Sequence, residues 1–256
     1  MRNKEKTMCS RDYFQYGQKL LDTRHIVYAD FVCYGPDLSE DQIEILMAHD
    51  IQYKTVNKDI WDTWMQSLKF QFVKDEIDNS GGGITFVDWD TYFLKDWGSI
   101  FYREKWSLGI TVRSEWIESN KMYRGWANGG VIFANNVGLN AISIRSFCEF
   151  ALDTIKYGGD DSLKEYDKIW KTLEQGRKPE KTHYRTDKHW WCDQVFLSAI
   201  VMASIKGMVS DGIYYYNIKQ FDCRQYNNMW EETPDTYIMH LKEKSGAPGS
   251  LKDGKK

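Results

Sequence analysis

Long hydrophobic runs are absent from this chain of 256 residues. No apolar stretch approaches the roughly 20 residues that a membrane-spanning helix needs. The start of the chain, Met1 to Lys6, is basic, but the apolar segment of a secretory signal peptide does not follow it. These absences predict a protein with no transmembrane segment and no signal peptide, and we expect it in the cytoplasm.

Cysteine is sparse, and its pattern excludes the common cysteine-based sites. The five cysteines are widely spaced, odd in number and without a CxxC pair. This pattern argues against a disulfide framework and indicates reduced thiols, as in a cytosolic protein. His183, His189 and Cys192 lie near one another in sequence, but their spacing fits no common zinc motif.

Concentrated positive charge is also missing. The formal net charge is −3 and both signs are interspersed along the chain. A nucleic-acid-binding protein usually shows a basic face or run, so we expect no nucleic-acid partner. The one basic cluster, Lys252 to Lys256, stands at the very end and reads as part of a frayed tail.

Aromatic residues, in contrast, are abundant: 11 Trp, 16 Tyr and 12 Phe. Together with a hydrophobic content of 42%, they allow a large apolar core. The same side chains could line a groove that stacks a sugar ring or a nucleobase. Composition alone leaves both interpretations open.

The first half of the chain alternates between strand and helix patterns. The expected strands are Thr7–Ser10, His25–Tyr34, Ile51–Val56 and Ile84–Val87, and the expected helices are Tyr13–Leu21, Ser39–Ala48 with Ser39 as cap, and Asp59–Ile77. Such alternation is typical of βαβ units and a mostly parallel sheet. Ligands bind such sheets beyond the carboxyl ends of the strands.

The second half is less regular. We expect strands over 108–112, 131–133, 214–223 and 236–239, and helices over 139–155, 163–173 and 190–205. No internal repeat or flexible linker interrupts the chain, which predicts one α/β domain over residues 1–244 and a disordered tail over 245–256. The predicted sheet is mixed, mostly parallel and flanked by helices.

Two carboxylates follow the short apolar strand that ends at Val87. Asp88 and Asp90 lie two residues apart, and in extended backbone such residues point to the same side. The pair could therefore hold a hard cation, Mg²⁺ or Mn²⁺, which in turn would hold a diphosphate. Two solvated turn residues are the alternative interpretation.

Four segments, in order, resemble the GT-A glycosyltransferases, and the resemblance is closest to the retaining, family-8-like members. Ile84–Leu94 (ITFVDWDTYFL) resembles the DxD segment, Gly125–Phe133 (GWANGGVIF) the strand that lines the donor-sugar pocket, Trp191–Gln194 (WCDQ) an acidic helix start, and Thr236–Lys242 (TYIMHLK) a late strand end. The similarity covers roughly residues 7 to 244. It implies a Rossmann-like GT-A domain that moves a sugar from a nucleoside-diphosphate sugar to an acceptor hydroxyl.

The resemblance also implies a metal site and a sugar pocket. Asp88, Asp90 and His240 would hold the metal, and the imidazole favours Mn²⁺ over Mg²⁺. Asn128 would hydrogen-bond to sugar hydroxyls. Asp193 would bind the sugar, steady an oxocarbenium-like centre or act as the acceptor base, with helix capping as its alternative.

Further residues are implied in contact with the nucleotide-sugar: Cys9, Ser10, Tyr13, Lys69, Asp88, Gly129, Gly130 and Gln194. Lys242 would neutralise charge on the departing diphosphate. Each has an ordinary structural alternative: core packing for Tyr13, a turn or bulge for the two glycines, and a surface position for each lysine. The glycines would allow close backbone approach to a ligand.

The chain departs from the family pattern near its end. Glu243 follows Lys242 where a glycine is expected nearby, and the usual K-P-W ending is absent. These departures bear on the role of Lys242 and on the stereochemistry. The resemblance to the retaining members implies retention, whereas inversion would need a base, for which Asp193 is the candidate.

The resemblance favours UDP as the nucleotide, with GDP open, and the sequence leaves the acceptor open among a glycan, a lipid-linked sugar and a protein. The polar stretch Lys156–Lys188 would contact the acceptor. A sugar nucleotidyltransferase and a non-catalytic carbohydrate-binding protein are the rival functions. The first is disfavoured because no N-terminal Gly-rich triphosphate loop is present, and the second needs no DxD pair.

Overall fold

The computed structural model describes residues 3–103, 105–113, 127–138, 140–153, 193–194, 196–198, 200, 217–229 and 231–241. Four features expected from the sequence lie outside these ranges: the helix over 163–173, the acceptor segment 156–188, Lys242, and the tail over 245–256. Of the helix expected over 190–205, the residues that the structure describes are helical. No helix in the described ranges is long and apolar enough to cross a membrane.

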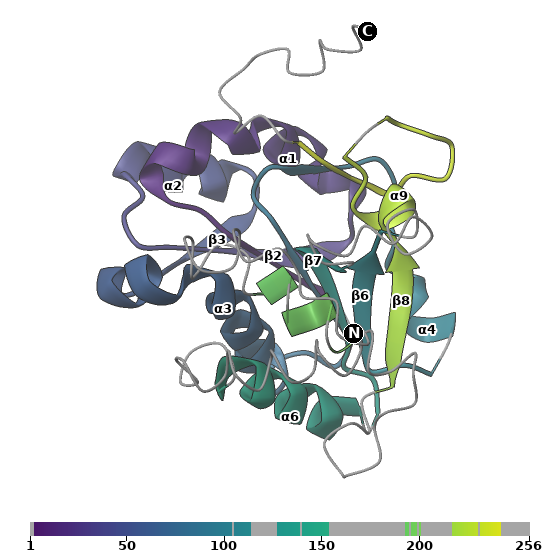
Figure 1. Cartoon of the computed structure of the whole chain (residues 1–256). Coiled ribbons are helices and arrows are strands. Elements are labelled where there is room, and N and C mark those ends of the chain that lie inside the picture. The colour runs from purple at the N-terminus through teal and green to yellow at the C-terminus, as the bar shows by residue number, and fades with distance from the viewer. Residues whose placement is uncertain are drawn as a thin grey trace, which may run out of the picture.

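A mixed sheet forms the centre of the described structure (Figure 1). Its seven strands are β1 (Asn3–Met8), β2 (Ala29–Gly35), β3 (Ile51–Thr55), β4 (Gly83–Val87), β6 (Leu108–Val112), β7 (Ala127–Asn135) and β8 (Ile218–Asp222). They lie in the order β3-β2-β1-β4-β7-β6-β8, and β7 alone among them runs antiparallel to its neighbours. The predicted mostly parallel sheet is confirmed.

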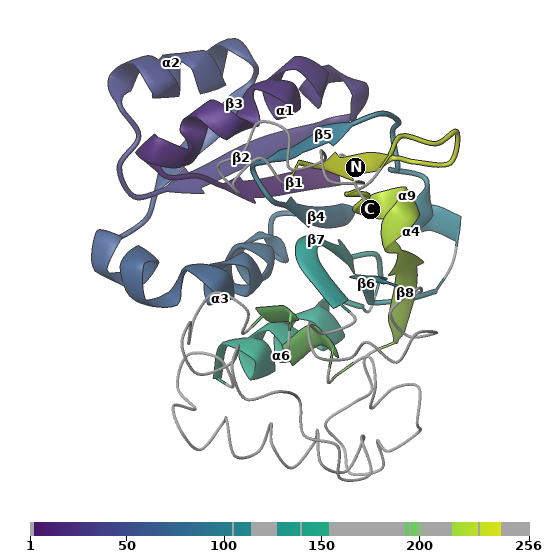
Figure 2. The ribbon, with the colours of Figure 1, turned by 45° about the horizontal axis from the view of Figure 1, so that its top comes forward.

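Helices cover both faces of this sheet (Figure 2). One face carries α3 (Lys58–Glu76) and α6 (Asn140–Leu152), and the other carries α1 (Gln18–Thr23) and α2 (Glu40–Ala48). Two short helices, α4 (Ile100–Arg103) and α9 (Cys223–Tyr226), and two 3₁₀ helices, η1 (Arg11–Gly17) and η2 (Arg24–Ile26), complete the described elements. Because strand side chains alternate, each face has its own apolar cluster. Phe86 packs in the cluster beneath α3 and α6, and Val87 in the opposite one.

The start of α2 follows the predicted capping pattern. The Ser39 hydroxyl accepts a hydrogen bond from the Gln42 backbone N–H at 3.3 Å, and the Gln42 side chain accepts one from the Ser39 N–H at 3.0 Å. This capping box satisfies two backbone donors that a helix start otherwise leaves unpaired. The predicted helix start is confirmed.

The first strand lies earlier than the sequence pattern indicated. We expected it at Thr7–Ser10, but β1 runs from Asn3 to Met8, and Cys9 and Ser10 follow it. The prediction was wrong because charged residues read as surface residues. Glu5 and Lys6 are instead fully buried at the middle of the sheet, where Lys6 Nζ lies 2.8 Å from the Glu76 carboxylate of α3.

A second, two-stranded sheet lies beside the main one. It pairs β5 (Thr91–Phe93) with β9 (Ile238–His240) in antiparallel fashion, and Thr91 is opposite His240. The sequence pattern did not predict β5, which has only three residues. This pairing brings the end of the described chain back to the segment that follows β4.

Candidate active site

The candidate site forms where the carboxyl end of β4 meets the amino end of β7. Val87, the last residue of β4, pairs with Val131, and the Asp88 N–H donates to the Gly130 carbonyl at 2.8 Å. Cys9 and Ser10 follow β1 at this same edge, where the Cys9 N–H donates to the Tyr34 carbonyl at the end of β2. The polar residues predicted from the sequence therefore gather at the edge where open α/β sheets bind ligands.

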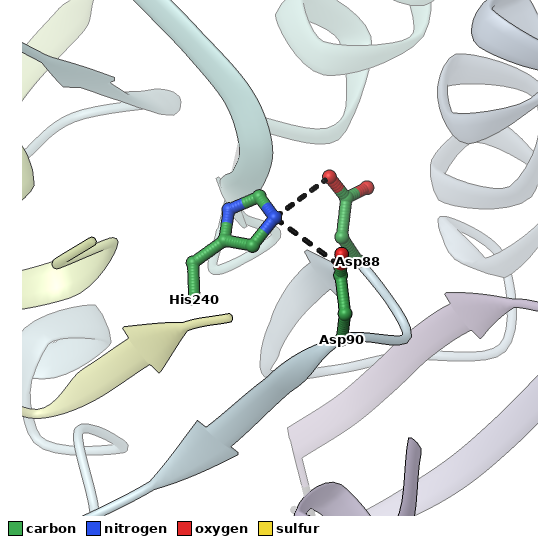
Figure 3. A group of neighbouring side chains, drawn as sticks. All are labelled: Asp88, Asp90 and His240. Atoms are coloured by element: carbon green, nitrogen blue, oxygen red, sulfur yellow. Dashed lines mark ion pairs between the residues drawn. The ribbon is translucent and has the colours of Figure 1, made fainter. Parts of the chain in front are cut away.

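Asp88, Asp90 and His240 converge at this edge (Figure 3). The Nε2 atom of His240 lies 3.2 Å from an Asp90 oxygen and 3.8 Å from an Asp88 oxygen, and the three ligand atoms lie within 4.8 Å of one another. The β5–β9 pairing sets this geometry, because the Leu241 N–H donates to the Asp90 carbonyl at 2.7 Å. Two carboxylate oxygens and one imidazole nitrogen form a donor set that suits Mn²⁺ or Mg²⁺.

The two carboxylates are electrostatically different. Burial raises the pKa of Asp88, and the neighbouring Asp90 and Asp193 add to this effect against Lys69 and His240. Burial acts on Asp90 in the same direction, but His240 and a hydrogen bond from Tyr13 outweigh it and lower the pKa of Asp90. Asp90 raises the pKa of Asp88 because like charges repel, and a bound cation would relieve this repulsion.

Tyr13 connects the segment after β1 to this trio. Its hydroxyl donates a hydrogen bond to the Asp90 carboxylate, and its half-buried ring lies 5.0 Å, centroid to centroid, from the Tyr16 ring. Tyr13 is therefore part of the site edge rather than only of the core. A role of Tyr13, Cys9 and Ser10 in holding a nucleoside stays a prediction.

Lys69 and Asp193 form a buried ion pair next to the trio. The Lys69 Nζ lies 2.6 Å from Asp193 Oδ2, 2.9 Å from the Gly129 carbonyl and 4.0 Å from an Asp88 oxygen. Both residues are 1% exposed, so Lys69 is not the surface lysine of the alternative interpretation. Within the described part of the chain, the second oxygen of Asp193, Oδ1, is buried and has no hydrogen-bond partner.

The two glycines of β7 leave room for these side chains. A Cβ atom on Gly129 would lie 2.0 Å from Asp193 Oδ2, and one on Gly130 would lie 2.8 Å from the His240 ring and 2.9 Å from Asp88 Oδ2. The strand also bulges here: Ile110 pairs with Ile132, but the next residue of β6, Thr111, pairs with Asn128. Bulges next to active sites re-aim backbone and side chains in this way.

Asn128 stands at the start of this bulge. Its carbonyl Oδ1 accepts from the Gly130 N–H at 3.1 Å, and its amide nitrogen lies 3.6 Å from the sulfur of Met229. Gln194, also predicted from the sequence, lies near Arg113, whose guanidinium is 3.4 Å from the Gln194 side-chain oxygen. The structure thus brings Asn128, Gly129, Gly130, Asp193 and Gln194 to one side of the trio, and their roles toward a sugar stay predictions.

Sequence reasoning missed three residues of this site. Arg113 follows β6 and is 3% exposed, while Thr111 and Asn227 are fully buried behind the trio. No motif marks any of them, since their neighbours come from distant parts of the chain. A buried arginine at the carboxyl end of a strand could be suspected only after the sheet order was established.

No protein-family model and no curated protein sequence matches this chain. Its fold, however, matches solved structures of glycosyltransferases. Galactosyltransferase LgtC, in complex with donor and acceptor sugar analogues, aligns with a TM-score of 0.52 at 10% identity over 93% of this chain and 87% of its own. Mouse xyloside xylosyltransferase 1 aligns with a TM-score of 0.50 at 12% identity over 94% and 98%.

The bifunctional glycosyltransferase WbbM aligns with a TM-score of 0.51 at 10% identity, and this chain covers 46% of it. The match to the first two structures extends over most of both chains, so the likeness is one of whole architecture. Identities this low establish the fold and leave the assignment to family 8 a prediction. The chain has the GT-A fold of these glycosyltransferases.

Proposed function

We propose that this protein is a metal-dependent glycosyltransferase that moves a sugar from a nucleoside-diphosphate sugar, with UDP favoured, to an acceptor hydroxyl. One observation carries the proposal: Asp88, Asp90 and His240 converge at the ligand-binding edge of a GT-A sheet, beside a buried Lys69–Asp193 pair. The aligned structures are glycosyltransferases, one of them in complex with donor and acceptor sugar analogues. A turn of solvated acids would need neither the histidine nor the buried pair.

The trio would hold Mn²⁺, with Mg²⁺ as the alternative ion. When bound, such an ion supplies Lewis-acid stabilisation of a departing diphosphate. Tyr13 holds Asp90 by its hydroxyl, and the β5–β9 pairing holds His240 opposite Thr91. The protein thereby keeps three ligand groups together without the ion, and binding then requires little reorganisation.

Asp193 is the group best placed to hold the donor sugar. Lys69 engages one carboxylate oxygen at 2.6 Å, which leaves the buried Oδ1 able to accept a hydrogen bond from a sugar hydroxyl. A buried acceptor without a partner costs free energy, and a hydroxyl at this position would recover it. Asn128, across the glycine pair, would orient the same sugar.

This arrangement favours sugar binding over base catalysis by Asp193, and for this reason we propose retention of configuration. The carboxylate is fixed by Lys69, which itself is held by the Gly129 carbonyl, so it cannot swing toward an incoming acceptor. The acceptor would be a glycan, a lipid-linked sugar or a protein, and the reaction would occur in the cytoplasm. Turnover of a UDP-sugar against panels of these acceptors, with anomeric analysis of the product, tests both statements.

Thermal unfolding with UDP, GDP, UTP or no nucleotide, each with and without Mn²⁺, tests the proposed function. A nucleotide at 100 times its dissociation constant adds about 2.7 kcal/mol to the free energy of unfolding. We expect UDP to stabilise the protein in the presence of Mn²⁺ and not in its absence. Asp90→Asn should abolish the effect, and Asp62→Asn, an exposed carboxylate on α3, should leave it unchanged.

Two other outcomes would decide against the proposal. Stabilisation by UTP alone would indicate a sugar nucleotidyltransferase. If no nucleotide stabilised the protein with or without Mn²⁺, the trio would not be a nucleotide–metal site, and binding of free glycans would become the measurement to make.

A further inference from the structure

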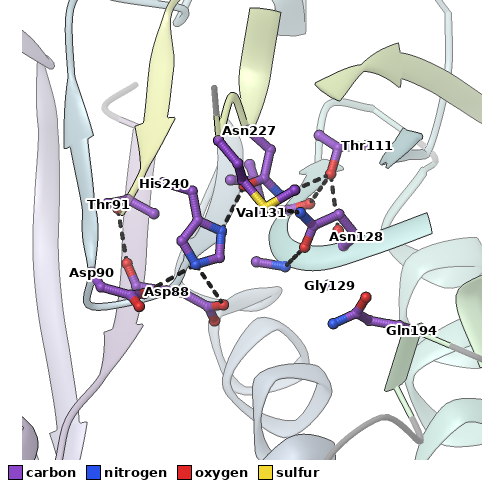
Figure 4. Close-up of polar contacts among 12 residues, drawn as sticks. Asp88, Asp90, Thr91, Thr111, Asn128, Gly129, Val131, Gln194, Asn227 and His240 are labelled. Carbon is purple, nitrogen blue, oxygen red and sulfur yellow. Dashed lines mark hydrogen bonds and ion pairs between the residues drawn. The ribbon is translucent and has the colours of Figure 1, made fainter. Parts of the chain in front are cut away.

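A chain of hydrogen bonds runs from His240 to the backbone of the β7 bulge (Figure 4). The Nδ1 atom of His240 lies 2.9 Å from Asn227 Oδ1, and Asn227 Nδ2 lies 3.2 Å from the Thr111 hydroxyl. That hydroxyl lies 2.9 Å from the Asn128 carbonyl and 3.3 Å from the Val131 carbonyl. Asn227 and Thr111 are fully buried, so solvent does not compete for these contacts.

The direction of each hydrogen bond follows from the two backbone carbonyls at the end of this hydrogen-bond network. Backbone carbonyls only accept, so the single hydroxyl proton of Thr111 is donated to one of the two carbonyls of the bulge. Thr111 must then accept from Asn227, and only the amide nitrogen of Asn227 can donate. The carbonyl oxygen of Asn227 therefore faces His240, and Nδ1 of the ring must carry a proton.

The tautomer has a consequence at the other ring nitrogen. A neutral imidazole protonated at Nδ1 presents a lone pair at Nε2, the atom that lies 3.2 Å from Asp90 and 3.8 Å from Asp88. In the imidazolium, and in the opposite neutral tautomer, Nε2–H donates to Asp90 and no lone pair faces the carboxylates. In the neutral ring, Nε2 therefore carries either a lone pair or a proton, and the contact of Nδ1 with Asn227 Oδ1 selects between the two.

We infer that Thr111 and Asn227 are positioning residues that fix the tautomer of His240 from the carbonyls of the β7 bulge, so that Nε2 is a metal ligand. The inference rests on the proposed metal-binding function of the trio. Outer-shell partners of metal-binding histidines act in this way in general. Here the same bulge contains Asn128 and the glycine pair, so the sugar side and the metal side of the site share one anchor.

The tautomer can be measured directly, without metal or activity. Long-range proton–nitrogen correlation spectra of the histidine-labelled protein, recorded at a pH where the ring is neutral, distinguish the two forms, and five histidines give a simple spectrum. His240→Gln assigns the signal. We expect the Nδ1–H form in the wild type and in Thr111→Ser, and a shift toward Nε2–H in Thr111→Val and Asn227→Leu.

Calorimetric titration of Mn²⁺ in the presence of UDP provides the second measurement. Loss of an outer-shell partner typically costs about 10–100-fold in metal affinity, and we expect this loss for Thr111→Val and Asn227→Leu. Thr111→Ser keeps the hydroxyl and should bind as the wild type does. Rescue by serine separates a positioning role from a packing role, because valine is the closer match to threonine in volume.

The outcomes separate this inference from the proposed function. An Nε2–H tautomer in the wild type, or a Thr111→Val protein with unchanged tautomer and Mn²⁺ affinity, overturns the inference whatever the enzyme does. A wild type that has the Nδ1–H form but does not bind Mn²⁺ with UDP overturns the proposed function and, with it, the role of Nε2 as a ligand.

Discussion

Adding one methyl group at Gly129 should impair the sugar pocket and leave the metal site able to bind. The new Cβ would lie 2.0 Å from Asp193 Oδ2, 3.0 Å from its Cγ and 3.2 Å from Lys69 Nζ. The backbone at Gly129 is not in the left-handed region, so alanine meets no conformational strain there. The effect of Gly129→Ala should therefore come from displacement of the ion pair alone.

The expected loss follows from the size of that displacement. Real Cβ atoms essentially never approach another atom within 3.0 Å, so the Asp193 carboxylate must retreat by about 1 Å, and misplacement of that size costs on the order of 100-fold in rate. The three atoms nearest to this methyl group belong to Asp193 and Lys69, and none of them belongs to the trio. We thus expect turnover to fall by about 100-fold, while UDP still stabilises the protein with Mn²⁺.

The neighbouring glycine provides the contrast. A Cβ on Gly130 would meet His240 at 2.8 Å and Asp88 at 2.9 Å, so Gly130→Ala should remove the Mn²⁺-dependent stabilisation itself. Gly138→Ala is a control outside the site: its methyl would meet no atom within 4 Å, and its positive φ of 65° should cost only stability, about 1 kcal/mol. Release of UDP from UDP-sugars measures turnover. Thermal unfolding measures stability and the Mn²⁺-dependent stabilisation by UDP.

Two results would refute this reasoning. One is a Gly129→Ala enzyme with wild-type turnover, which would mean that Asp193 does not act at the position where the structure places it. The other is an exchange of the two phenotypes, with metal binding lost at Gly129 and kept at Gly130. Either result would show that the Lys69–Asp193 pair does not hold the sugar or that the trio does not hold the metal.

Three further predictions concern buried and capping groups. Burial raises the pKa of Glu5 well above 4.5, opposed by the Thr85 hydroxyl and reinforced by Asp96, so the folded state keeps a proton that the unfolded state releases. The stability from Glu5 is therefore complete below pH 4.5 and is lost as the pH rises toward the folded pKa, by up to about 1.4 kcal/mol per pH unit. In urea unfolding over a pH series, the stability of Glu5→Gln relative to the wild type should rise as the pH increases above 4.5. A difference in stability that stays constant with pH would contradict the assignment. Lys69→Met leaves Asp193 buried without its ammonium partner and should cost about 3–5 kcal/mol, which Asp193→Asn in the same chain should partly restore. Ser39→Ala removes the α2 cap and should cost about 1 kcal/mol by the same urea assay, whereas the exposed Ile45→Ala should cost less.

The parts of the fold predicted correctly from the sequence are those specified by local chemistry. The capping box at Ser39 depends on residues three positions apart, and the strand before Asp88 is a short apolar run bounded by turn residues. The carboxylate pair could be placed because a parallel strand ends at the ligand-binding edge wherever it lies in the sheet. None of these inferences required knowledge of a distant contact.

The parts that were wrong or missing depend on distant contacts. Lys6 is buried because Glu76 of α3 lies against it, and Lys69 is buried because Asp193, 124 residues later, accepts from it. A charged residue in a sequence is expected at the solvent-exposed surface unless its ion-pair partner is known. That partner is known only from the folded structure. The same reason hid Thr111 and Asn227, whose residue types are common in loops and strand edges.

The glycine pair shows how a correct signal can have an unexpected cause. The sequence suggested that Gly129 and Gly130 allow backbone to approach a ligand, whereas in the structure the space beside each glycine is occupied by Asp193 and by His240 with Asp88. The glycines thus bring the protein's own acidic and basic groups against one strand, where the bulge anchored by Thr111 holds them. A site arranged in this way has its ligand groups in place before any ligand binds. Any side chain larger than hydrogen at either position should therefore disturb the site even when the fold is intact.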